Sequence, residues 1–423
     1  MAAVKPAAIT GRGIVSPLGA GVELTFQHMC EGRVATGPEE SIVSLRPGQH
    51  VGTVDMTTLT TPQSHRGVRR LDRTVMLVVE AVTEALTEAD LLPTSSRRLP
   101  DNRIALCLGT STGPITVSAG AAVAFGQQGE AGLKRVAPLA AVHASPAFIT
   151  GEVCRRFEVT GPSMTLNAEC ASGNTVVAIG MHLLSSGAAD AVVCCAVDAS
   201  VNELTVAQSN IIGALAAGQC RPFDRDRDGF VISEGAAAVV LEPVGRETCP
   251  PDAPTPAVHV LGVGMTTDTF HPTAPAESGA SLVEAVKAAL TQAELPPAAV
   301  DVVSAHGTGT PMNDRSELEA LEEVFGGDLA RIPVHSVKSM IGHTLAAAGL
   351  IELIVLSHSL ETGLLPPTMG CRTPLETSAD LVLHACRQGS FTTGLSTSIG
   401  FGGNNTAAVL GLACSLTRRK ALT

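Results

Sequence analysis

The chain has 423 residues, 45% of them apolar and 16% charged, and its formal net charge is −12. This length and apolar content predict a soluble globular protein of two or three domain-sized units and exclude a disordered chain. The acidic balance, with no run of Lys and Arg before the last few residues, excludes a nucleic-acid-binding surface.

The eleven cysteines include no C-x-x-C pair and no disulfide-like spacing. We therefore interpret them as reduced thiols of a cytoplasmic protein, most of them core residues. The first residues, MAAVKPAAITGRG, lack the long apolar stretch of an export signal. The most apolar later segment, 345–356, is interrupted by Glu352, so we expect no membrane span.

Short apolar runs alternate with segments of helical periodicity along the chain. The runs are typical of strands covered on both faces, and they lie at 104–108, 191–197, 236–241, 300–304 and 407–410. Apolar residues at helical spacing predict helices at 175–186 and 314–325. This alternation indicates a layered α/β fold. The Pro-rich stretch 242–255 predicts a linker between two halves, 1–250 and 256–415.

Cys170 stands out within NAECASGNTVV, residues 167–177, because a predicted helix follows it directly. A thiol at a helix N-terminus has a lowered pKa and a larger thiolate fraction, as a nucleophile requires. The alternative is that Cys170 is one more packing residue of an Ala-rich chain. The motif alone leaves both interpretations open.

Two histidines follow in separate motifs. His306 ends a predicted buried strand in SAHGTGTPMNDRSE, where α/β folds place reactive groups, although a structural histidine would fit equally well. His343 lies in VHSVKSMIGHTLAAAGLIEL together with Lys338 and Glu352. The two histidines are 37 positions apart with no cysteine close by, so we expect no zinc site.

The segment STSIGFGGNNTAAVL, residues 396–410, is a glycine-rich loop around Phe401. Its glycines allow backbone N–H groups to turn toward an anion, but the loop does not match a nucleotide-binding P-loop. A thiol, two imidazoles, a lysine and an amide loop together form a coherent set for acyl transfer through a thioester.

These motifs, in this order, resemble the β-ketoacyl-acyl carrier protein synthases of the elongating, decarboxylating type, which belong to the thiolase-fold superfamily. The similarity spans nearly the whole chain. Its motifs are GRGIVSPLG (11–19), GPSMTLNAECASG (161–173), CRPFDRDRDGFVISEGAAAVVLE (220–242), DTFHPTAP (268–275), AHGTGTPMNDRSE (305–317), VKSMIGHTLAAAG (337–349) and GFGGNN (400–405).

The resemblance implies a thiolase fold, with two similar α/β halves in a five-layer αβαβα body that forms a dimer through its first half. It implies that Cys170 carries the acyl group, while His306 and His343 promote malonyl decarboxylation and Lys338 holds them in place with Glu352. The amides of Cys170 and Phe401 would form the oxyanion hole, with Phe401 as a gate. Thr308 and Thr310 would contact the pantetheine arm, and Asp314 and Glu317 would be structural.

The resemblance further implies decarboxylative Claisen condensation with malonyl-acyl carrier protein, in fatty-acid or, slightly favoured, polyketide or polyene biosynthesis. No cofactor is expected beyond the carrier's phosphopantetheine. The expected partners are an acyl carrier protein and a second subunit, either identical or similar to a chain-length factor. Two alternatives stay open, a non-elongating partner subunit and an acyltransferase that uses the same cysteine.

A cluster of arginines allows two interpretations. Arg66, Arg69, Arg70 and Arg73 form either a patch for the acidic carrier or an ordinary solvated helix face.

Two residues depart from the family pattern. Glu169 stands before the cysteine where relatives have a small residue, and Ile399 stands where many have Phe. A carboxylate beside the thiol opposes thiolate formation unless it is neutralised or turned away. We expect Glu169 either to form a salt bridge at a dimer interface or, together with Ile399, to line the acyl pocket and select an unusual starter.

Overall fold

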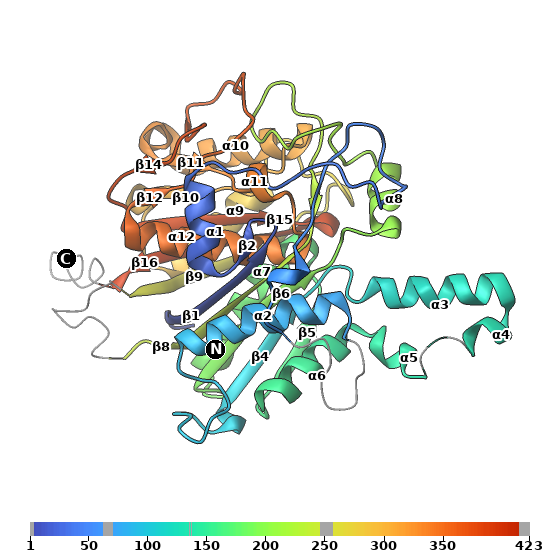
Figure 1. The fold of residues 1–423 in the computed structure, drawn as a ribbon. Helices are drawn as coiled ribbons and strands as arrows, with labels where there is room; N and C mark the ends of the chain where they lie inside the picture. Colours follow the sequence, from blue (N-terminus) through green and yellow to red (C-terminus); the bar gives the residue numbers. More distant parts are fainter. Residues whose placement is uncertain (1–3, 62–70, 135, 137, 246–256, 414–423) are drawn as a thin grey trace.

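The computed structural model describes residues 4–61, 71–134, 136, 138–245 and 257–413 (Figure 1). The predicted strands are present, as β4 (Ile104–Gly109), β6 (Ala191–Asp198), β8 (Gly235–Pro243), β10 (Val302–Ser304) and β16 (Asn404–Leu412). The predicted helices are α7 (Ser172–Ser185) and α10 (Pro311–Phe325). The predicted linker begins within β8, and from residue 246 it lies outside the described residues.

The main sheet consists of two runs of strands with the same order and the same directions. In the first half the order is β1 (Ala7–Ser16), β8, β6, β4 and β5 (Ser163–Leu166). In the second it is β9 (Val258–Thr267), β16, β15 (Thr393–Ile399), β10 and β11 (Pro333–His335), with β13 (Asp380–Leu381) added at the edge. The runs meet where Ala7 and Ala8 of β1 pair with β9. The chain therefore contains the same α/β unit twice.

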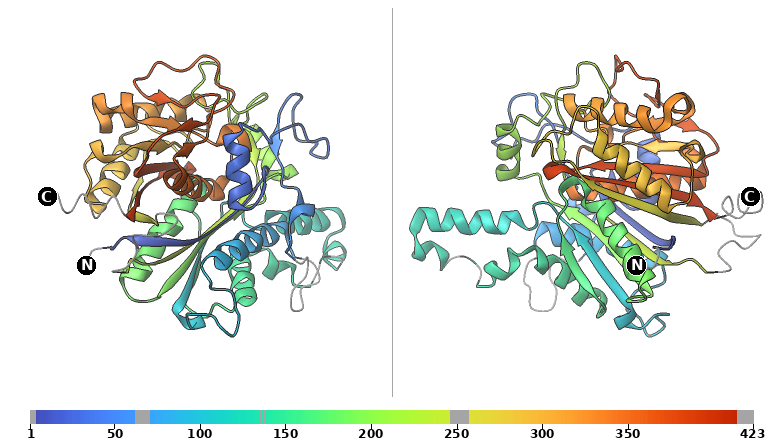
Figure 2. Two further views of the ribbon diagram at one scale, coloured as in Figure 1. Left: turned by 60° about the vertical axis from the view of Figure 1, so that its left-hand side comes forward. Right: turned by 180° about the vertical axis from the view of Figure 1, so that it is seen from behind.

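We call the two runs of strands the first and the second sheet. Helices cover the outer face of each sheet and also lie between the two sheets (Figure 2). Outside the first sheet are α2 (Arg73–Glu88) and α6 (Pro146–Phe157), and outside the second are α9 (Ala280–Gln292) and α10. The central layer holds α7 and α12 (Ala348–Thr362), which pack in one core cluster with side chains from both sheets. This is the five-layer thiolase arrangement that the resemblance implied.

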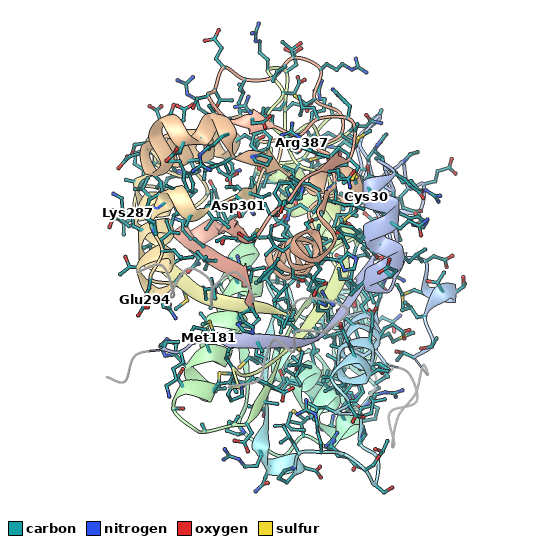
Figure 3. All side chains as sticks on the ribbon, turned by 90° about the vertical axis from the view of Figure 1, so that its left-hand side faces the viewer. Cys30, Met181, Lys287, Glu294, Asp301 and Arg387 are labelled. Atoms are coloured by element: carbon teal, nitrogen blue, oxygen red, sulfur yellow. The ribbon has the colours of Figure 1, made fainter. Side chains whose placement is uncertain are left out.

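Adjacent residues of one strand supply different cores, because side chains alternate across a strand. In β4, Leu106 packs with the outer helix α2, while Cys107 faces the central helices. Figure 3 shows the result at the level of side chains, with Met181 of α7 inside the body and Lys287 of α9 at the surface. Strands buried on both faces explain the continuous apolar runs of the sequence.

A glycine on β1 and a glycine on β9 allow the outer helices to pack close to these strands. A Cβ on Gly13 would lie 1.9 Å from the carbonyl oxygen of Ala81 in α2. A Cβ on Gly264 would lie 1.9 Å from that of Ala285 in α9. The two halves thus repeat the same close contact between strand and helix, which only glycine permits.

The shorter elements connect these layers. The helices among them are α1 (Val22–Cys30), α3 (Ile115–Gln128), α4 (Glu130–Leu133), α5 (Ala140–His143), α8 (Glu203–Ile211) and α11 (Lys338–Ile341). The two-residue strands are β2 (Gly19–Ala20), β3 (Val51–Gly52), β7 (Ile232–Ser233), β12 (Leu364–Leu365) and β14 (Arg387–Gln388).

An arm made of α3, α4 and α5 projects from the first half (Figures 1 and 2). The sequence-based prediction contained no such arm. Helix α3 is apolar in composition, yet it buries none of its residues against the rest of the chain. Val123, Phe125, Leu139 and Val142 are each more than half exposed. An apolar surface of this kind indicates contact with another chain.

The segment Leu345–Thr362 is the one stretch of the described residues long and apolar enough to cross a membrane. The structure buries 78% of it in the protein interior, where α12 forms part of the central layer. Glu352, which interrupts its apolar pattern, is buried in an ion pair with Lys338. The segment is accounted for as a core helix.

Candidate active site

Cys170 lies in the turn that leads into α7, where a short 3₁₀ helix, Glu169–Ala171, precedes the α-helix. The same turn, Leu345–Ala347, precedes α12 in the second half, so Cys170 corresponds to Ala346 and Glu169 to Leu345. Glu169 and Leu345 both adopt a φ of 49°. This left-handed conformation costs a residue with a side chain about 1 to 2 kcal/mol. Cys170 itself is 5% exposed.

The pKa of the Cys170 thiol is raised to about 12. Burial is the largest cause and Glu169 the next, while Lys338 and the backbone amide of Phe401 act in the opposite direction. The expectation that the helix N-terminus lowers this pKa is therefore wrong for the free thiol. The sulfur lies in a region of low dielectric beside carboxylates, and desolvation outweighs the helix dipole.

His306 follows β10, and the backbone around it is held by a buried carboxylate. Glu317 accepts hydrogen bonds from the amides of His306 and Gly307 at 2.7 and 2.8 Å. Asp314 accepts from the Gly309 amide at 3.1 Å and is itself fully buried. These two carboxylates of α10 fix the loop that carries the imidazole.

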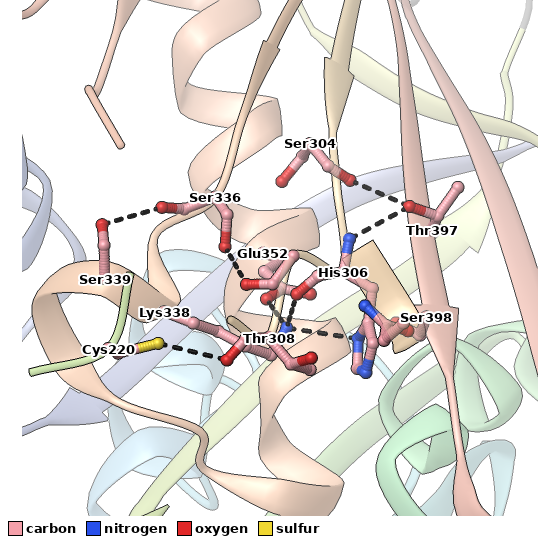
Figure 4. A network of polar contacts seen from close by, with 12 residues as sticks. Cys220, Ser304, His306, Thr308, Ser336, Lys338, Ser339, Glu352, Thr397 and Ser398 are labelled. Carbon is pink, nitrogen blue, oxygen red and sulfur yellow. Dashed lines mark hydrogen bonds and ion pairs between the residues drawn. The ribbon is translucent and has the colours of Figure 1, made fainter. Parts of the chain in front are cut away.

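Lys338 sets the tautomer of His306 (Figure 4). Its ammonium group lies 3.2 Å from His306 Nδ1, donates to the His306 carbonyl at 2.6 Å and pairs with Glu352. An ammonium group only donates, so Nδ1 accepts and the proton of the neutral ring is on Nε2. Burial, and then Lys338, holds the pKa of His306 well below its usual range. His306 is therefore a neutral donor through Nε2.

His343 is positioned by the first half of the chain. Its amide donates to Val231 at 2.7 Å, and its carbonyl accepts from Ser233 at 3.0 Å. Its ring lies edge-on to Phe230 and His306, with centroids 5.2 and 5.4 Å away. Burial and Lys338 hold the pKa of His343 well below its usual range, so this imidazole is neutral too.

The glycine-rich loop closes the site from the side of β15. The Phe401 amide donates toward the Cys170 sulfur. The loop is tied to the segment 268–272, because Gly402 donates to Pro272 at 2.7 Å and Asp268 donates to the Gly403 carbonyl at 2.7 Å. A Cβ on Gly403 would lie 1.9 Å from the Asp268 carbonyl oxygen, so this loop requires glycine there.

A cavity of about 450 Å³ joins these groups. Most of the predicted site residues line it, namely Cys170, His306, Thr308, Thr310, His343, Ile399 and Phe401. Glu169 is not among the lining residues, although Leu345, its counterpart in the second half, is. Lys338 and Glu352 lie behind the histidines, and Asp314 and Glu317 lie behind the loop.

Comparisons with known proteins identify the family of this chain. The model of the β-ketoacyl synthase N-terminal domain matches residues 5–246, and that of the C-terminal domain matches residues 257–372. The chain belongs to the β-ketoacyl synthase family.

Relatives and solved structures cover this β-ketoacyl synthase almost completely. It is 34% identical to the tetracenomycin polyketide synthase ketoacyl synthase alpha subunit of Streptomyces glaucescens, over 96% of this chain and 97% of the relative. It is 30% identical to 3-oxoacyl-[acyl-carrier-protein] synthase 2 of Staphylococcus aureus, over 95% and 99%. The solved ishigamide ketosynthase/chain length factor has a TM-score of 0.85 and 28% identity, over 97% of this chain and 100% of that one.

The synthase has a buried acid near Cys170 that sequence reasoning missed. Asp198, at the end of β6, accepts from the amides of Ser111, Thr112 and Ala346 and from two threonine hydroxyls. In the internal repeat the Ala346 amide corresponds to the Cys170 amide, so Asp198 accepts from the second half's equivalent of that amide. A charged residue at the end of the apolar run AVVCCAVD was the available signal.

Part of the predicted basic patch has another role in this synthase. Arg66, Arg69 and Arg70 lie outside the described residues. Arg73 begins α2 and pairs with the buried Glu234, and it also donates to the Val54 carbonyl at 2.7 Å. Arg73 is therefore engaged by the body of the protein. Among the described residues, no group of three or more His, Cys, Asp or Glu side chains could hold a metal ion.

Proposed function

We propose that this synthase joins an acyl group carried on Cys170 to a malonyl unit on an acyl carrier protein, with loss of CO2, to give a β-ketoacyl carrier. The observation that carries the proposal is the convergence of one thiol, two neutral imidazoles and a directed backbone amide on a single cavity. This set matches the needs of thioester chemistry followed by enolate chemistry.

In the first step the Cys170 sulfur attacks the thioester of the acyl carrier. The amides of Cys170 and Phe401 stabilise the oxyanion, and the pantetheine thiolate leaves with the proton given up by Cys170. Loss of one such donor costs about 3 to 4 kcal/mol of transition-state stabilisation in comparable sites. Because burial raises the pKa of Cys170 to about 12, the free thiol stays protonated, and its proton leaves as the sulfur attacks the carbonyl held in the oxyanion hole.

In the second step the malonyl thioester loses CO2 and becomes an enolate. His306, protonated on Nε2, and His343 donate hydrogen bonds to the enolate oxygen. Their depressed pKa values keep both rings neutral. Each neutral ring still carries one N–H group that can donate. The enolate carbon then attacks the acyl thioester, and the Cys170 thiolate leaves.

The remaining predicted residues take supporting roles in this proposal. Thr308 and Thr310 line the cavity and would hold the pantetheine arm. Ile399 and Phe401 also line it, and they would contact the acyl group beside Cys170 and gate access. Lys338 keeps His306 in the required tautomer and Glu352 neutralises Lys338. The two halves, 1–250 and 256–415, contribute the nucleophile and the imidazoles respectively. No cofactor is needed beyond the pantetheine of the carrier.

The proposed partners are an acyl carrier protein and a second synthase-like subunit that covers the apolar arm. The arm's exposed side chains and the ketosynthase/chain length factor relative favour a heterodimer with a chain-length-factor-like subunit. The polyketide relative at 34% identity favours polyketide over fatty-acid biosynthesis. We place the reaction in the cytoplasm.

Three readouts test the proposal on the full chain, alone and with a chain-length-factor-like partner. Intact-protein mass spectrometry measures acyl-Cys170, a CO2 assay measures decarboxylation, and chromatography detects the β-ketoacyl carrier. We expect one CO2 per product in the native protein, no loading in Cys170→Ala, and loading without CO2 in His306→Ala. Acyl transfer without CO2 would instead establish an acyltransferase, and absence of all three activities would establish a non-elongating subunit.

A further inference from the structure

Glu169 is held beside the nucleophile at an energetic cost. It is half-buried, it has a left-handed backbone, and it directly precedes Cys170. Burial raises the pKa of its carboxyl group, and the charge of Asp198 raises it further. No Lys or Arg among the described residues pairs with this carboxyl group. The described part of the chain therefore supplies no strong partner for it.

The neighbours of Glu169 do not satisfy its carboxylate. Asp198 is saturated by five donors and repels a second negative charge. Ser111 lies near enough to lower the pKa of Glu169, but too loosely for a well-formed hydrogen bond, and its buried oxygen has no other partner. Two polar groups are thus left with unused hydrogen-bonding capacity next to the reacting sulfur.

The internal repeat shows on which side of Cys170 these groups lie. In the second half Leu345 lines the cavity, together with residues that follow β10 and end β15. In the first half the equivalent positions are Glu169, Ser111 after β4 and Asp198 at the end of β6. None of these three lines the cavity. Glu169 and Asp198 therefore lie beside the Cys170 sulfur, whose pKa they raise, but outside the cavity that Thr308 and Thr310 line.

A condensing site must hold two substrates at one sulfur. The incoming malonyl pantetheine arm needs the cavity with His306 and His343, so the acyl group on Cys170 must extend toward the other side. A plain alkyl chain there would strip water from Glu169 and Ser111 without replacing their hydrogen bonds.

We propose that Glu169, with Ser111, is a specificity-determining residue that selects an acyl group bearing a hydrogen-bond donor, a hydroxyl or an ammonium group, close to the thioester. The inference rests on the proposed function, because it concerns the group that Cys170 carries. The donor would fill the capacity that the protein leaves unused, as polar sites reject analogues that lack the matching group. We expect a preference of about 10- to 100-fold over the unsubstituted chain.

Competition experiments with intact-protein mass spectrometry test this preference. Three acyl carrier proteins, bearing butyryl, 3-hydroxybutyryl and 4-aminobutyryl groups, are offered to the full chain with its partner subunit. The ratio of initial loading rates on Cys170 gives the selectivity, and the two donor-bearing substrates distinguish a hydroxyl from an ammonium group. We expect the selectivity to fall at least about tenfold in Glu169→Ala, with faster loading of butyryl.

Glu294→Ala is the matched control, because Glu294 has a φ of 55° and is exposed far from the cavity. It removes a left-handed glutamate without touching the site. Fastest loading of butyryl by the native protein, unchanged in Glu169→Ala, would overturn the inference. So would an equal loss with all three acyl groups accompanied by subunit dissociation, which would place Glu169 in an interface salt bridge. Failure of every acyl group to load would refute the proposed function instead.

Discussion

Glu352 provides the sharpest test of the electrostatics behind the histidines. Its carboxyl group is 1% exposed, and its only cationic partner among the described residues is Lys338. Burial raises its pKa from 4.5 to about 7, against the opposing effect of Lys338. The native state therefore binds this proton more tightly than the unfolded state does. Stability from this group is present at low pH and is lost as the pH rises from about 4.5 through 7.

The size of the effect follows from the two pKa values. A change from 4.5 to about 7 corresponds to a loss of about 3 kcal/mol between pH 5 and pH 9. Glu352→Gln removes the titrating group and keeps a side chain that accepts from Lys338, so it removes this loss.

Urea unfolding at pH 5 and pH 9, followed by circular dichroism, measures the difference. Intrinsic fluorescence is unsuitable because the chain has no Trp and no Tyr. Glu294→Gln is the control, since an exposed glutamate should leave the pH dependence unchanged. A fall in stability between the two pH values that is the same in Glu352→Gln as in the native protein would refute the reasoning.

Three further predictions follow from the geometry. Alkylation of Cys170 by iodoacetamide should rise about tenfold per pH unit up to pH 10, because its pKa is raised to about 12, and a plateau below pH 8 would contradict this. CO2 release should stay constant from pH 8 to pH 6, because a lowered pKa keeps His306 neutral; a loss with a midpoint near 6.5 would exclude that assignment. Gly264→Ala should lower the free energy of unfolding by about 1 to 3 kcal/mol, since its Cβ would meet the Ala285 carbonyl. Gly327→Ala, with open space around it, should change the free energy little, and equal losses in both variants would disprove the contact argument.

Much of the fold was predictable because its signals are local. Strands covered on both faces must be apolar throughout, so β4, β6 and β8 were visible as continuous runs. The arm of α3 to α5 was not predicted, because an apolar helix that packs on no other part of its own chain has the same composition as a core helix. The repeat of the two halves was expected only from the family resemblance, and in the structure it is carried by strand order, glycine contacts and backbone angles.

The residue types of the active site were determined by the sequence alone. A cysteine before a helix, two histidines at strand and turn ends and a glycine-rich loop are local patterns, and their order identified the family. The tertiary structure decided the states of these groups. Desolvation and neighbouring charges act through space, so only the folded chain shows that the Cys170 thiol has a raised pKa and that Lys338 fixes the tautomer of His306. The correspondence of Glu169 with Leu345 follows from the repeat of two halves that are distant in sequence, and no local pattern records that repeat.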